Sequence, residues 1–438
     1  MRYELCLSQI GGPYWEKKSF SEGGGEPVSL DPSKPRQTII GFGGAFTEAA
    51  AHVYASMSPA LKRRTIALCF GEDGLRYNLG RTTIGSCDFS LSQYDYARKD
   101  DLSDFSLRHD EKEIIPFLKD AEKARPLRLL ASSWSPPAEW KTSGSKLQGG
   151  RLKKNRYGIY AAYLAKYVEG MTKIGLPIEF ITPQNEPLAT QTWESCLYGP
   201  AEEARLALEL KKRMPDIKIL AYDHNRDKLW DRERDIFRQR EVKEAVYGMA
   251  YHWYFPEGHE EIAKCLASFP DKPLIQTESC VELLNLNRED PTAAIGNPKG
   301  MRRYAKDRLE DLRNGSSGFI DWNLLLDLKG GPNHAGNYCE APLMSDGKRL
   351  IVNPSYYAIK HLSRFIDPNS RLIPSGFPVG VLGAAFLNPD GGLSLVMLNE
   401  GAGKAISLFI ENHQCSCYFN KNSICSIRIW QTLKQTKK

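Results

Sequence analysis

The sequence predicts an α/β protein: a closed (β/α)8 TIM barrel with an attached all-β side domain that resembles a β-sandwich. Two observations carry this prediction. Between residues 36 and 366, short apolar runs alternate with amphipathic segments eight times, and eight strand–helix units are typical of a closed barrel. After residue 367 the helical period stops and short β-like runs take over. A doubly wound open sheet is the alternative for the first region.

The strands of the barrel are read from apolar runs bounded by turn residues. They are expected at 39–43, 77–84, 127–132, 178–182, 217–222, 248–253, 273–277 and 318–323. The first helix is expected to begin at Ser58-Pro59, since proline favours the first turn. The other helices are expected at 112–123, 157–174, 201–214, 241–247, 260–268, 301–313 and 354–365.

The side domain is predicted from residues 367–438 together with 1–35, leaving 36–366 for the barrel. Its strands are expected at 378–386, 393–398, 405–410 and 424–430. The first 38 residues read as irregular, with a short strand within 27–30. We assign them to the side domain because the two ends of a domain often lie close together.

Composition excludes several classes of protein. Hydrophobic residues make up 41% and charged residues 26% of the chain, which is ordinary for a soluble globular protein. The net charge is +6, and no basic stripe indicates a nucleic-acid partner. No apolar run approaches the length of a transmembrane segment.

A cytoplasmic location is predicted from the N-terminus and the cysteines. The opening residues MRYELCLSQI include Glu4 and lack the apolar core of a signal peptide. The ten cysteines are scattered without a CxxC pair. They read as reduced, packed thiols rather than as a zinc site, which favours a reducing compartment.

Two predicted strands end in a glutamate. Strand 178–182 runs into Pro-Gln-Asn185-Glu186-Pro, and strand 273–277 runs into Glu278. In a parallel barrel the carboxyl ends of the strands meet at one rim, so these side chains are expected to converge. Either glutamate alone reads more simply as a surface charge. The pair is what a two-carboxylate glycosidase requires, with one group protonated and the other ionised.

The other strand ends carry polar and aromatic side chains, which together are typical of a sugar pocket. These candidates are Arg81, Asp88, Trp140, Asn185, Asp223, His224, His252, Tyr254 and Trp322. A buried histidine or tryptophan in the core is the simpler reading for some of them. His252 with Asp223 and His224 could make a metal site, but no ligand spacing stands out. We therefore predict neither a metal nor a cofactor. The GFGG at 41–44 lacks the spacing of a phosphate-binding loop.

Several motifs, in order along residues 36–365, resemble glycoside hydrolase family 30, whose members include glucosylceramidases. These motifs are GFGGAFTEAA (41–50), SCDFS (86–90), TPQNEP (182–187), HWY (252–254), TES (277–279), DWN (321–323) and GGPN (330–333). The resemblance implies a retaining β-glucosidase of the glucosylceramidase type that needs no cofactor. Its substrate would be a β-glucoside, a glycolipid of sphingolipid metabolism or an oligosaccharide.

The resemblance also implies roles for individual residues. Glu186 would be the acid/base and Glu278 the nucleophile. The supporting roles would be Asn185 on the sugar 2-hydroxyl, Asp88 and Trp140 lining the subsite of the non-reducing sugar, Trp322 on the pocket wall, and Arg81, His252 and Tyr254 supporting the carboxylates.

The sequence does not decide between several substrates. The segments TQTWESC (190–196) and DHNRD (223–227) are similar to those of bacterial members, some of which act as β-1,6-glucanases. A β-1,6-glucanase, a β-xylosidase or a β-fucosidase on the same scaffold are therefore alternatives. A non-catalytic carbohydrate-binding protein is a further one, which the presence of both glutamates and Asn185 argues against.

Overall fold

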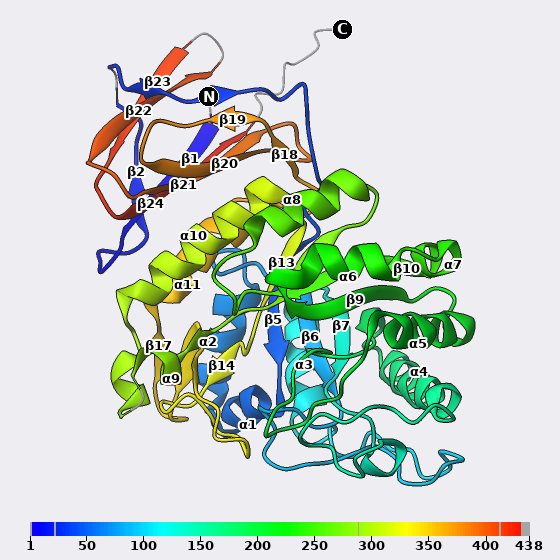
Figure 1. Ribbon diagram of the computed structural model, residues 1–438. Coiled ribbons are helices and arrows are strands. Elements are labelled where there is room, and N and C mark those ends of the chain that lie inside the picture. The colour runs from blue at the N-terminus through cyan, green and yellow to red at the C-terminus, as the bar shows by residue number, and fades with distance from the viewer. Residues whose placement is uncertain (1, 22, 288, 411–412, 431–438) are drawn as a thin grey trace, which may run out of the picture.

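The predicted (β/α)8 barrel is confirmed by a computed structural model, which describes residues 2–21, 23–287, 289–410 and 413–430 (Figure 1). Eight parallel strands close in the order β10-β11-β13-β5-β6-β7-β8-β9. They are β5 Gly41–Phe46, β6 Leu79–Ile84, β7 Arg128–Ser133, β8 Ile178–Thr182, β9 Lys218–Asn225, β10 Val246–His252, β11 Leu274–Glu278 and β13 Gly318–Asp321.

Helices cover the outside of the barrel. They are α1 Glu48–Ser56, α2 Pro59–Phe70, α3 Ile114–Ala124, α4 Tyr157–Lys173, α5 Pro200–Arg213, α6 Leu229–Ile236, α7 Arg240–Ala245, α8 His259–Ser268, α9 Leu283–Leu286, α10 Pro298–Asn314 and α11 Pro354–Ser363. Proline opens α2, α5, α10 and α11. Its fixed φ and missing N–H suit the first helical turn, so these starts are set by local sequence.

Helices α1, α6 and α9 were not predicted, and several element boundaries differ from the prediction. The first barrel strand continues to Phe46, beyond the predicted end at residue 43. Helix α1 follows at once, and the Thr47 side chain caps it by accepting from the Ala50 N–H at 3.1 Å. Helix α6 was also not predicted, because charged residues dominate its short sequence and obscure its buried face.

Apolar side chains fill the interior of the barrel toward the amino ends of its strands. Each comes from a strand or from a residue next to one. This apolar layer comprises Ile40, Leu79, Leu130, Phe180, Leu220, Ala250, Ile275 and Ile320. All of them are buried. Packed layers of this kind make a TIM barrel a solid core rather than a pore.

A polar layer lies directly above the apolar layer, toward the carboxyl ends of the strands. It comprises Arg81, Ser132, Thr182, Asp223, His252 and Thr277, all buried. Side chains alternate along a strand, so residues two apart point to the same side. Leu79 and Arg81 on β6, like Ile275 and Thr277 on β11, therefore both face inward.

Asp223 reaches the polar layer through an irregularity in β9. It lies three residues beyond Leu220, which would normally direct it outward. The pairing with β10 skips one residue here, from Ala250 opposite Tyr222 to Tyr251 opposite His224. Tyr222 and Asp223 have φ angles of +81° and +52°. Such a β-bulge redirects a side chain, and positive φ at non-glycine residues is uncommon outside functional sites.

The side domain is all-β, as predicted. Its larger sheet is antiparallel and has the order β18-β20-β21-β24-β1-β2. In a smaller sheet β22 pairs antiparallel with β23 and parallel with β3. Their strands are β1 Arg2–Gln9, β2 Glu16–Lys18, β3 Glu26–Pro27, β18 Arg371–Ile373, β20 Val381–Leu387, β21 Leu393–Asn399, β22 Lys404–Ile410, β23 His413–Phe419 and β24 Ser423–Trp430.

The N-terminus is more regular than the prediction. Strand β1 was read as irregular chain, yet it pairs along its whole length with β24, from Arg2 opposite Trp430 to Gln9 opposite Ser423. Strand β23 was not predicted either. The pairing of the two chain ends agrees with one shared side domain, while boundaries at residues 36 and 366 stay a prediction.

The side domain packs on α10 and α11 at one end of the barrel (Figure 1). His361 of α11 lies between the two ends of the chain, with its ring nitrogens 2.8 Å from Ser8 Oγ of β1 and Ser426 Oγ of β24. Burial lowers the pKa of His361 to about 3, so the ring is neutral. These bonds join the side domain to the barrel.

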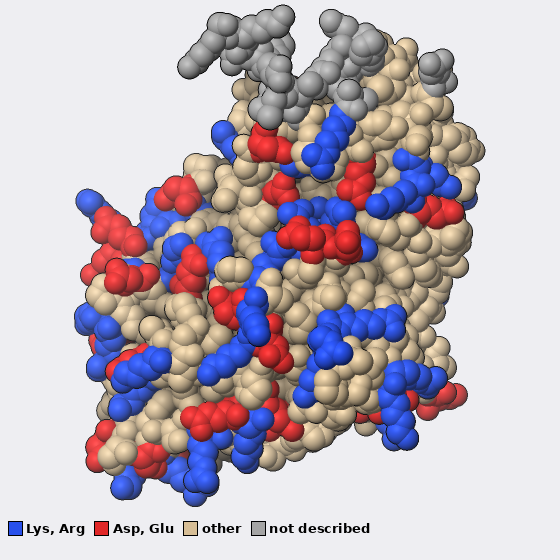
Figure 2. Space-filling view, turned by 180° about the vertical axis from the view of Figure 1, so that it is seen from behind, with Lys and Arg blue, Asp and Glu red and all other residues tan. Residues whose placement is uncertain are grey.

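Basic and acidic side chains are interspersed over the face shown in Figure 2. Among the residues that the structure describes, no helix has the length and apolar character needed to cross a membrane. The cytoplasmic location stays a prediction.

Candidate active site

A cavity of about 420 Å³ opens at the carboxyl ends of the barrel strands. Its wall includes Asp88, Trp134, Asn185, Glu186, Gln191, Trp193, His224, Asn225, Tyr254, Glu278, Cys280, Glu282, Asn285, Trp322, Asn337 and Cys339. The two predicted glutamates therefore meet in one pocket, as their strand-end positions required. Arg81 and His252 lie buried beneath it.

Glu278 ends β11 and is held by two donors. Its Oε2 accepts from Arg81 Nη1 at 2.6 Å, and its Oε1 accepts from Tyr254 Oη at 2.9 Å. Burial raises the pKa of Glu278 above its ordinary value, and the charges of His252 and Arg81 limit that rise. The two donors fix the carboxylate in one orientation.

Arg81 ties the carboxylates together. Its Nη2 donates to Asn185 Oδ1 at 2.8 Å and to Asp223 Oδ2 at 2.9 Å. The guanidinium carbon lies 4.9 Å from the centre of the Trp134 ring and 5.4 Å from that of Trp322. A planar, permanently charged group suits this position, because it bonds several oxygens while resting on aromatic faces.

Asp223 is the hub of the polar layer. Its Oδ1 accepts from Thr277 Oγ1 at 2.5 Å and lies 3.0 Å from His252 Nε2, while its Oδ2 accepts from Thr182 Oγ1 at 2.7 Å. Burial alone would raise the pKa of Asp223, but Arg81 and His252 hold it well below its usual range. Asp223 was predicted as a strand-end residue and weighed as a metal ligand, and its role as the hub was not predicted.

Glu186 follows β8 in a left-handed turn, with φ of +47°. Its backbone N–H donates to the Asp223 carbonyl at 2.9 Å, which fixes the turn. Its Oε2 accepts from Gln191 Nε2 at 3.4 Å. The Glu186 side chain is 15% exposed, against 8% for Glu278, so it is the more open of the two carboxylates.

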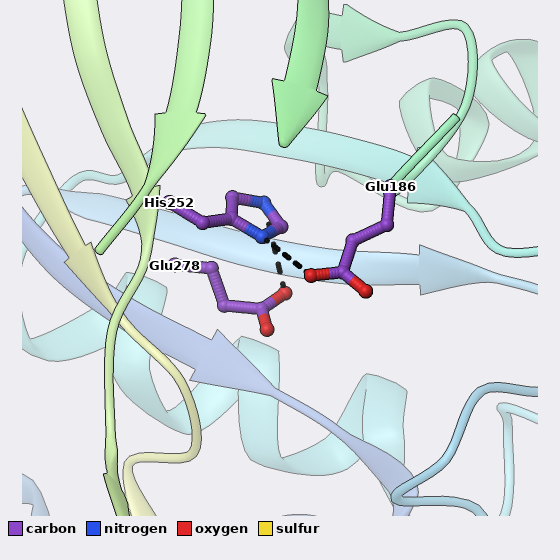
Figure 3. Close-up of side chains that lie close together, drawn as sticks. All are labelled: Glu186, His252 and Glu278. Atoms are coloured by element: carbon purple, nitrogen blue, oxygen red, sulfur yellow. Dashed lines mark hydrogen bonds and ion pairs between the residues drawn. The ribbon is translucent and has the colours of Figure 1, made fainter. Parts of the chain in front are cut away.

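His252 at the end of β10 lies between Glu186 and Glu278 (Figure 3) and also contacts Asp223. Its Nδ1 lies 3.3 Å from Glu186 Oε1, and its Nε2 lies 3.9 Å from Glu278 Oε2. These two carboxylates and Asp223 outweigh burial and raise the pKa of His252 to about 9. The ring is therefore an imidazolium at neutral pH. Conversely, His252 and His224 outweigh burial at Glu186 and lower its pKa.

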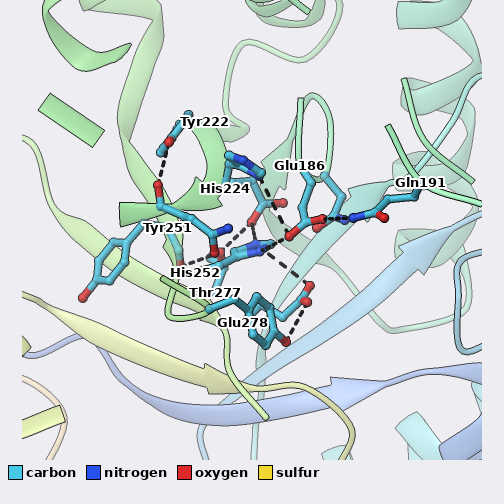
Figure 4. Close-up of polar contacts among 12 residues, drawn as sticks. Glu186, Gln191, Tyr222, His224, Tyr251, His252, Thr277 and Glu278 are labelled. Carbon is cyan, nitrogen blue, oxygen red and sulfur yellow. Dashed lines mark hydrogen bonds and ion pairs between the residues drawn. The ribbon is translucent and has the colours of Figure 1, made fainter. Parts of the chain in front are cut away.

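The same three residues have to be tested as a metal site. Ligand atoms of Glu186, His252 and Glu278 all lie within 4.8 Å of one another. An imidazolium has no lone pair to offer a metal, because both of its nitrogens carry protons. Arg81 adds a second positive charge to the group. The arrangement suits a proton network better than a cation (Figure 4), and the absence of a metal stays a prediction.

One end of the pocket offers unused polar atoms for a ligand. Asp88 Oδ2 accepts from Asn337 Nδ2 at 3.0 Å. Asp88 Oδ1 and Trp322 Nε1 are buried and have no partner among the described residues. Burial, helped by the charge of Glu278, raises the pKa of Asp88 to about 8. A hydroxylated ligand could satisfy both atoms, as expected of a sugar subsite.

The predicted place of Trp140 is wrong. Its indole Nε1 donates to Asp100 Oδ1 at 3.0 Å, and its ring meets Tyr163 edge-on with centroids 5.7 Å apart. The pocket wall is instead formed by Trp134, which stacks on Trp322 at 5.1 Å. Trp134 directly follows β7, whereas the turn Ala138–Trp140 packs the later tryptophan into the core.

Apart from His224, the outer side of the pocket was not predicted. It is formed by Gln191, Trp193, His224, Asn225, Glu282 and Asn285. Gln191 and Trp193 lie in the loop after β8, His224 and Asn225 end β9, and Glu282 and Asn285 belong to β12, Val281–Glu282, and to α9. The segments TQTWESC and DHNRD, which set this chain apart in sequence, contain four of them and were the available signal.

A TIM barrel whose paired carboxylates converge with aromatic and amide side chains in a strand-end pocket defines a glycoside hydrolase. Residues 39–366 match the model of the glycosyl hydrolase family 30 TIM-barrel domain. The chain belongs to glycoside hydrolase family 30.

Relatives and solved structures agree with this assignment. The lysosomal acid glucosylceramidase of Mus musculus is 30% identical over 406 residues, covering 87% of this chain and 76% of the mouse protein. An endo-1,6-beta-D-glucanase of Neurospora crassa is 26% identical, covering 87% and 82%. The crystal structure of SrfJ from Salmonella typhimurium has a TM-score of 0.91 at 31% identity, covering 99% of this chain and 100% of that one. The endo-beta1,6-glucanase BT3312 has a TM-score of 0.89 at 25% identity, with the same coverage.

Proposed function

We propose that this glycoside hydrolase is a retaining β-glucosidase of the glucosylceramidase type, with Glu278 as nucleophile and Glu186 as acid/base. One observation carries the proposal: an oxygen of Glu186 and an oxygen of Glu278 lie within 4.8 Å of each other. Retaining enzymes keep their carboxyl groups about 5–5.5 Å apart, whereas inverting enzymes leave about 6.5–9.5 Å for a water.

In the first step, Glu278 attacks the anomeric carbon and forms a glycosyl–enzyme. The bonds from Arg81 and Tyr254 favour its ionised form and aim it. Glu186 is the more exposed carboxylate, which suits a group that reaches the leaving oxygen. It gives its proton to that oxygen, and then removes a proton from the water that releases the sugar.

The acid proton is shared between Glu186 and His252. The pKa of Glu186 is lowered, so in the empty pocket the proton rests on His252, whose pKa is raised to about 9. The 3.3 Å contact between His252 Nδ1 and Glu186 Oε1 provides the path for transfer. As bond cleavage begins, negative charge on the leaving oxygen draws the proton from His252 through Glu186.

The sugar is bound by groups with free capacity on the inner side of the pocket. Asp88 and Trp322 present the unpaired atoms described above. The Asn185 side chain lines the pocket while its Oδ1 is held by Arg81, which leaves its amide N–H groups for the sugar 2-hydroxyl.

The rim of the pocket favours a glycolipid. Leu188, Phe255 and Leu286 are 46%, 42% and 45% exposed. Each is one residue from a pocket-lining side chain, namely Ala189, Tyr254 and Asn285. Exposed apolar side chains next to pocket-lining residues offer contacts for an apolar partner, here the lipid part of glucosylceramide.

A β-1,6-glucan is the second candidate. The outer side of the pocket carries Gln191, Asn225 and Asn285 beside Trp193. Amides and an indole are the groups that hold a further sugar. The likeness to two endo-1,6-glucanases points the same way.

Sugar release from five substrates tests the proposal: p-nitrophenyl β-glucoside, β-xyloside and β-fucoside, glucosylceramide, and a β-1,6-glucan. Glucose released from the β-glucoside and glucosylceramide, first appearing as the β-anomer, supports the proposal. If oligosaccharides are released from the glucan and no other substrate is cleaved, the β-1,6-glucan is the substrate. First release of the α-anomer would overturn the retaining mechanism. Preferred cleavage of the xyloside or fucoside would show that the enzyme recognises xylose or fucose instead of glucose. Silence on all five from folded protein would favour carbohydrate binding without catalysis.

A further inference from the structure

Two cysteines lie in contact in the pocket wall, beside the nucleophile. Cys280 is two residues beyond Glu278, and Cys339 belongs to strand β15, Cys339–Glu340. Their Sγ atoms are 2.9 Å apart, and both residues line the cavity. Strand β15 pairs with β12, Val281–Glu282, which holds the two segments together. All ten cysteines, which fall within the described residues, are free thiols.

The Cys280 sulfur also reaches the residue that orients the nucleophile. Tyr254 Oη lies 3.4 Å from Cys280 Sγ and donates to Glu278 Oε1 at 2.9 Å. The tyrosine has a single hydroxyl hydrogen and gives it to Glu278, and the Cys280 thiol donates to Cys339 Sγ, so the contact between Cys280 Sγ and Tyr254 Oη is one of packing. A change at Cys280 is therefore one side chain away from the reacting carboxylate.

Hydrogen bonds hold the backbone around Cys280, so a disulfide between Cys280 and Cys339 would move side chains before it moved the backbone. Trp253 Nε1 donates to the Cys280 carbonyl at 3.0 Å, and the Trp322 N–H donates to the Ser279 carbonyl at 2.8 Å. A disulfide requires its sulfurs about 2.05 Å apart. The sulfurs already touch, so a small rotation of each side chain closes the bond and shifts the Cys280 sulfur against the Tyr254 hydroxyl.

We propose that Cys280 and Cys339 are a thiol–disulfide exchange site that reacts with small organic disulfides, and that the resulting disulfide slows turnover by disturbing Tyr254 and Glu278. This goes beyond the proposed function. Only the turnover readout rests on that function, because formation of the disulfide is measured separately.

The exchange balances without a further reactant. One protein thiol loses its proton and attacks a sulfur of the small disulfide, whose S–S bond breaks and releases one small thiolate. The second protein thiol, also deprotonated, attacks the protein sulfur of the mixed disulfide and releases the other small thiolate. The protein loses two electrons and two protons, and the small disulfide gains them as two thiols.

The reaction is slow at neutral pH. Burial raises the pKa of the Cys280 thiol, and the close contact with Cys280 together with burial raises the pKa of the Cys339 thiol well above its ordinary value. The thiolate is the attacking form, so exchange should accelerate as the pH rises. Access runs through the pocket, which admits a small reagent and which bound substrate would block.

The test equilibrates the folded protein in redox buffers of 2-hydroxyethyl disulfide and 2-mercaptoethanol. Peptide mass spectrometry reports whether Cys280 and Cys339 are linked, and hydrolysis of p-nitrophenyl β-glucoside reports turnover. The expected result is a linked peptide lighter by two hydrogens, with kcat/KM roughly ten- to hundredfold lower, the effect of disturbing a hydrogen bond to a charged group. Excess 2-mercaptoethanol should restore turnover.

Two variants keep the test specific, each compared with its own reduced sample. Cys339→Ala should form no internal link and keep its turnover at buffer ratios that inhibit the wild type. Cys417→Ala, at a buried thiol of the side-domain sheet, should lose turnover as the wild type does. Absence of a link in folded protein at every ratio would overturn the proposal. So would a link without loss of turnover, or an equal loss in Cys339→Ala.

Discussion

The apolar and polar layers of the barrel interior lie two residues apart on most of the strands they share, and three apart on β9, yet they are built differently. The apolar layer takes one hydrocarbon side chain from each strand position. The polar layer is a chain of hydrogen bonds that runs from Thr182 through Asp223 to His252 and Arg81. The strand period places both sets inward. The comparison teaches that one set supplies stability and the other supplies chemistry.

The two layers differ in energy as well as in composition. A buried ion pair rarely stabilises a protein more than apolar packing of equal volume, but removing one partner leaves an unpaired buried charge and costs about 3–5 kcal/mol. Arg81 and Asp223 are fully buried and 2.9 Å apart. The polar layer is therefore held in place by its own complementarity, while hydrocarbon burial below it drives folding.

The largest effect is expected at the nucleophile. Glu278→Gln keeps the shape and the donors around the side chain but removes the attacking charge. We expect turnover of p-nitrophenyl β-glucoside to fall by about 10⁴-fold or more, with a circular dichroism spectrum and unfolding midpoint close to wild type. Activity near the wild-type level would show that another residue attacks the sugar.

The next effect separates the acid from the nucleophile. Glu186→Gln should lower turnover about 10²–10⁴-fold on an alkyl glucoside, because the leaving oxygen is no longer protonated. A dinitrophenyl glucoside needs no such help, so its first step should be largely spared. Measuring both substrates under single-turnover conditions gives the comparison, and an equal loss on the two would exclude the acid role.

His252→Gln should narrow the pH profile from both sides, with roughly a tenfold loss of kcat/KM at its optimum. In the wild type the shared proton is lost as pH rises through about 9, the raised pKa of His252. Without the ring this proton sits on Glu186 alone and is lost at lower pH. The pKa of Glu278, already raised, also loses a lowering charge, so the acidic limb moves up. An unchanged basic limb would contradict the shared proton.

The smallest effect on activity should come from the apolar layer. Phe180→Ala removes a ring that is 2% exposed and should lower the free energy of unfolding by about 3–5 kcal/mol. Because it touches no reacting group, kcat/KM at a permissive temperature should stay within about twofold. Denaturant titration and steady-state kinetics measure the two quantities.

Thr277→Val is the matched change in the polar layer, since it removes only the hydroxyl that donates to Asp223. It should affect kcat/KM more than Phe180→Ala does and the free energy of unfolding less. The reverse order in both measurements would break the distinction between the layers.

Much of the barrel could be predicted because its signals are local. Strand β8 was predicted with its observed bounds, since an apolar run ended by Pro183 leaves little freedom. Helix α4 was predicted within one residue, from its long amphipathic period. Helix α1 and strand β1 were missed, because an Ala-rich segment and a half-exposed strand depend on what packs against them.

The candidate site, like the barrel, could be predicted where its position follows from strand ends and not where it depends on packing. Glu186 and Glu278 could be paired from sequence, since parallel strands bring their ends to one rim whatever the side chains are. Trp140 could not be told from Trp134 on that ground. Both follow β7 closely, and only the packing of the turn Ala138–Trp140 decides which ring enters the pocket.

By itself, the sequence determined the eight-unit barrel, the all-β side domain and the position of two glutamates at strand ends, because period, proline placement and strand-end position are properties of short segments. Its ordered motifs indicated the family. Tertiary structure alone decided that Asp223 would be the hub, that Cys280 would meet Cys339, and that β1 would pair with β24. These relations join residues far apart in the chain or depend on a bulge in β9. No local pattern specifies them, since they are set by which strands pair and in what register.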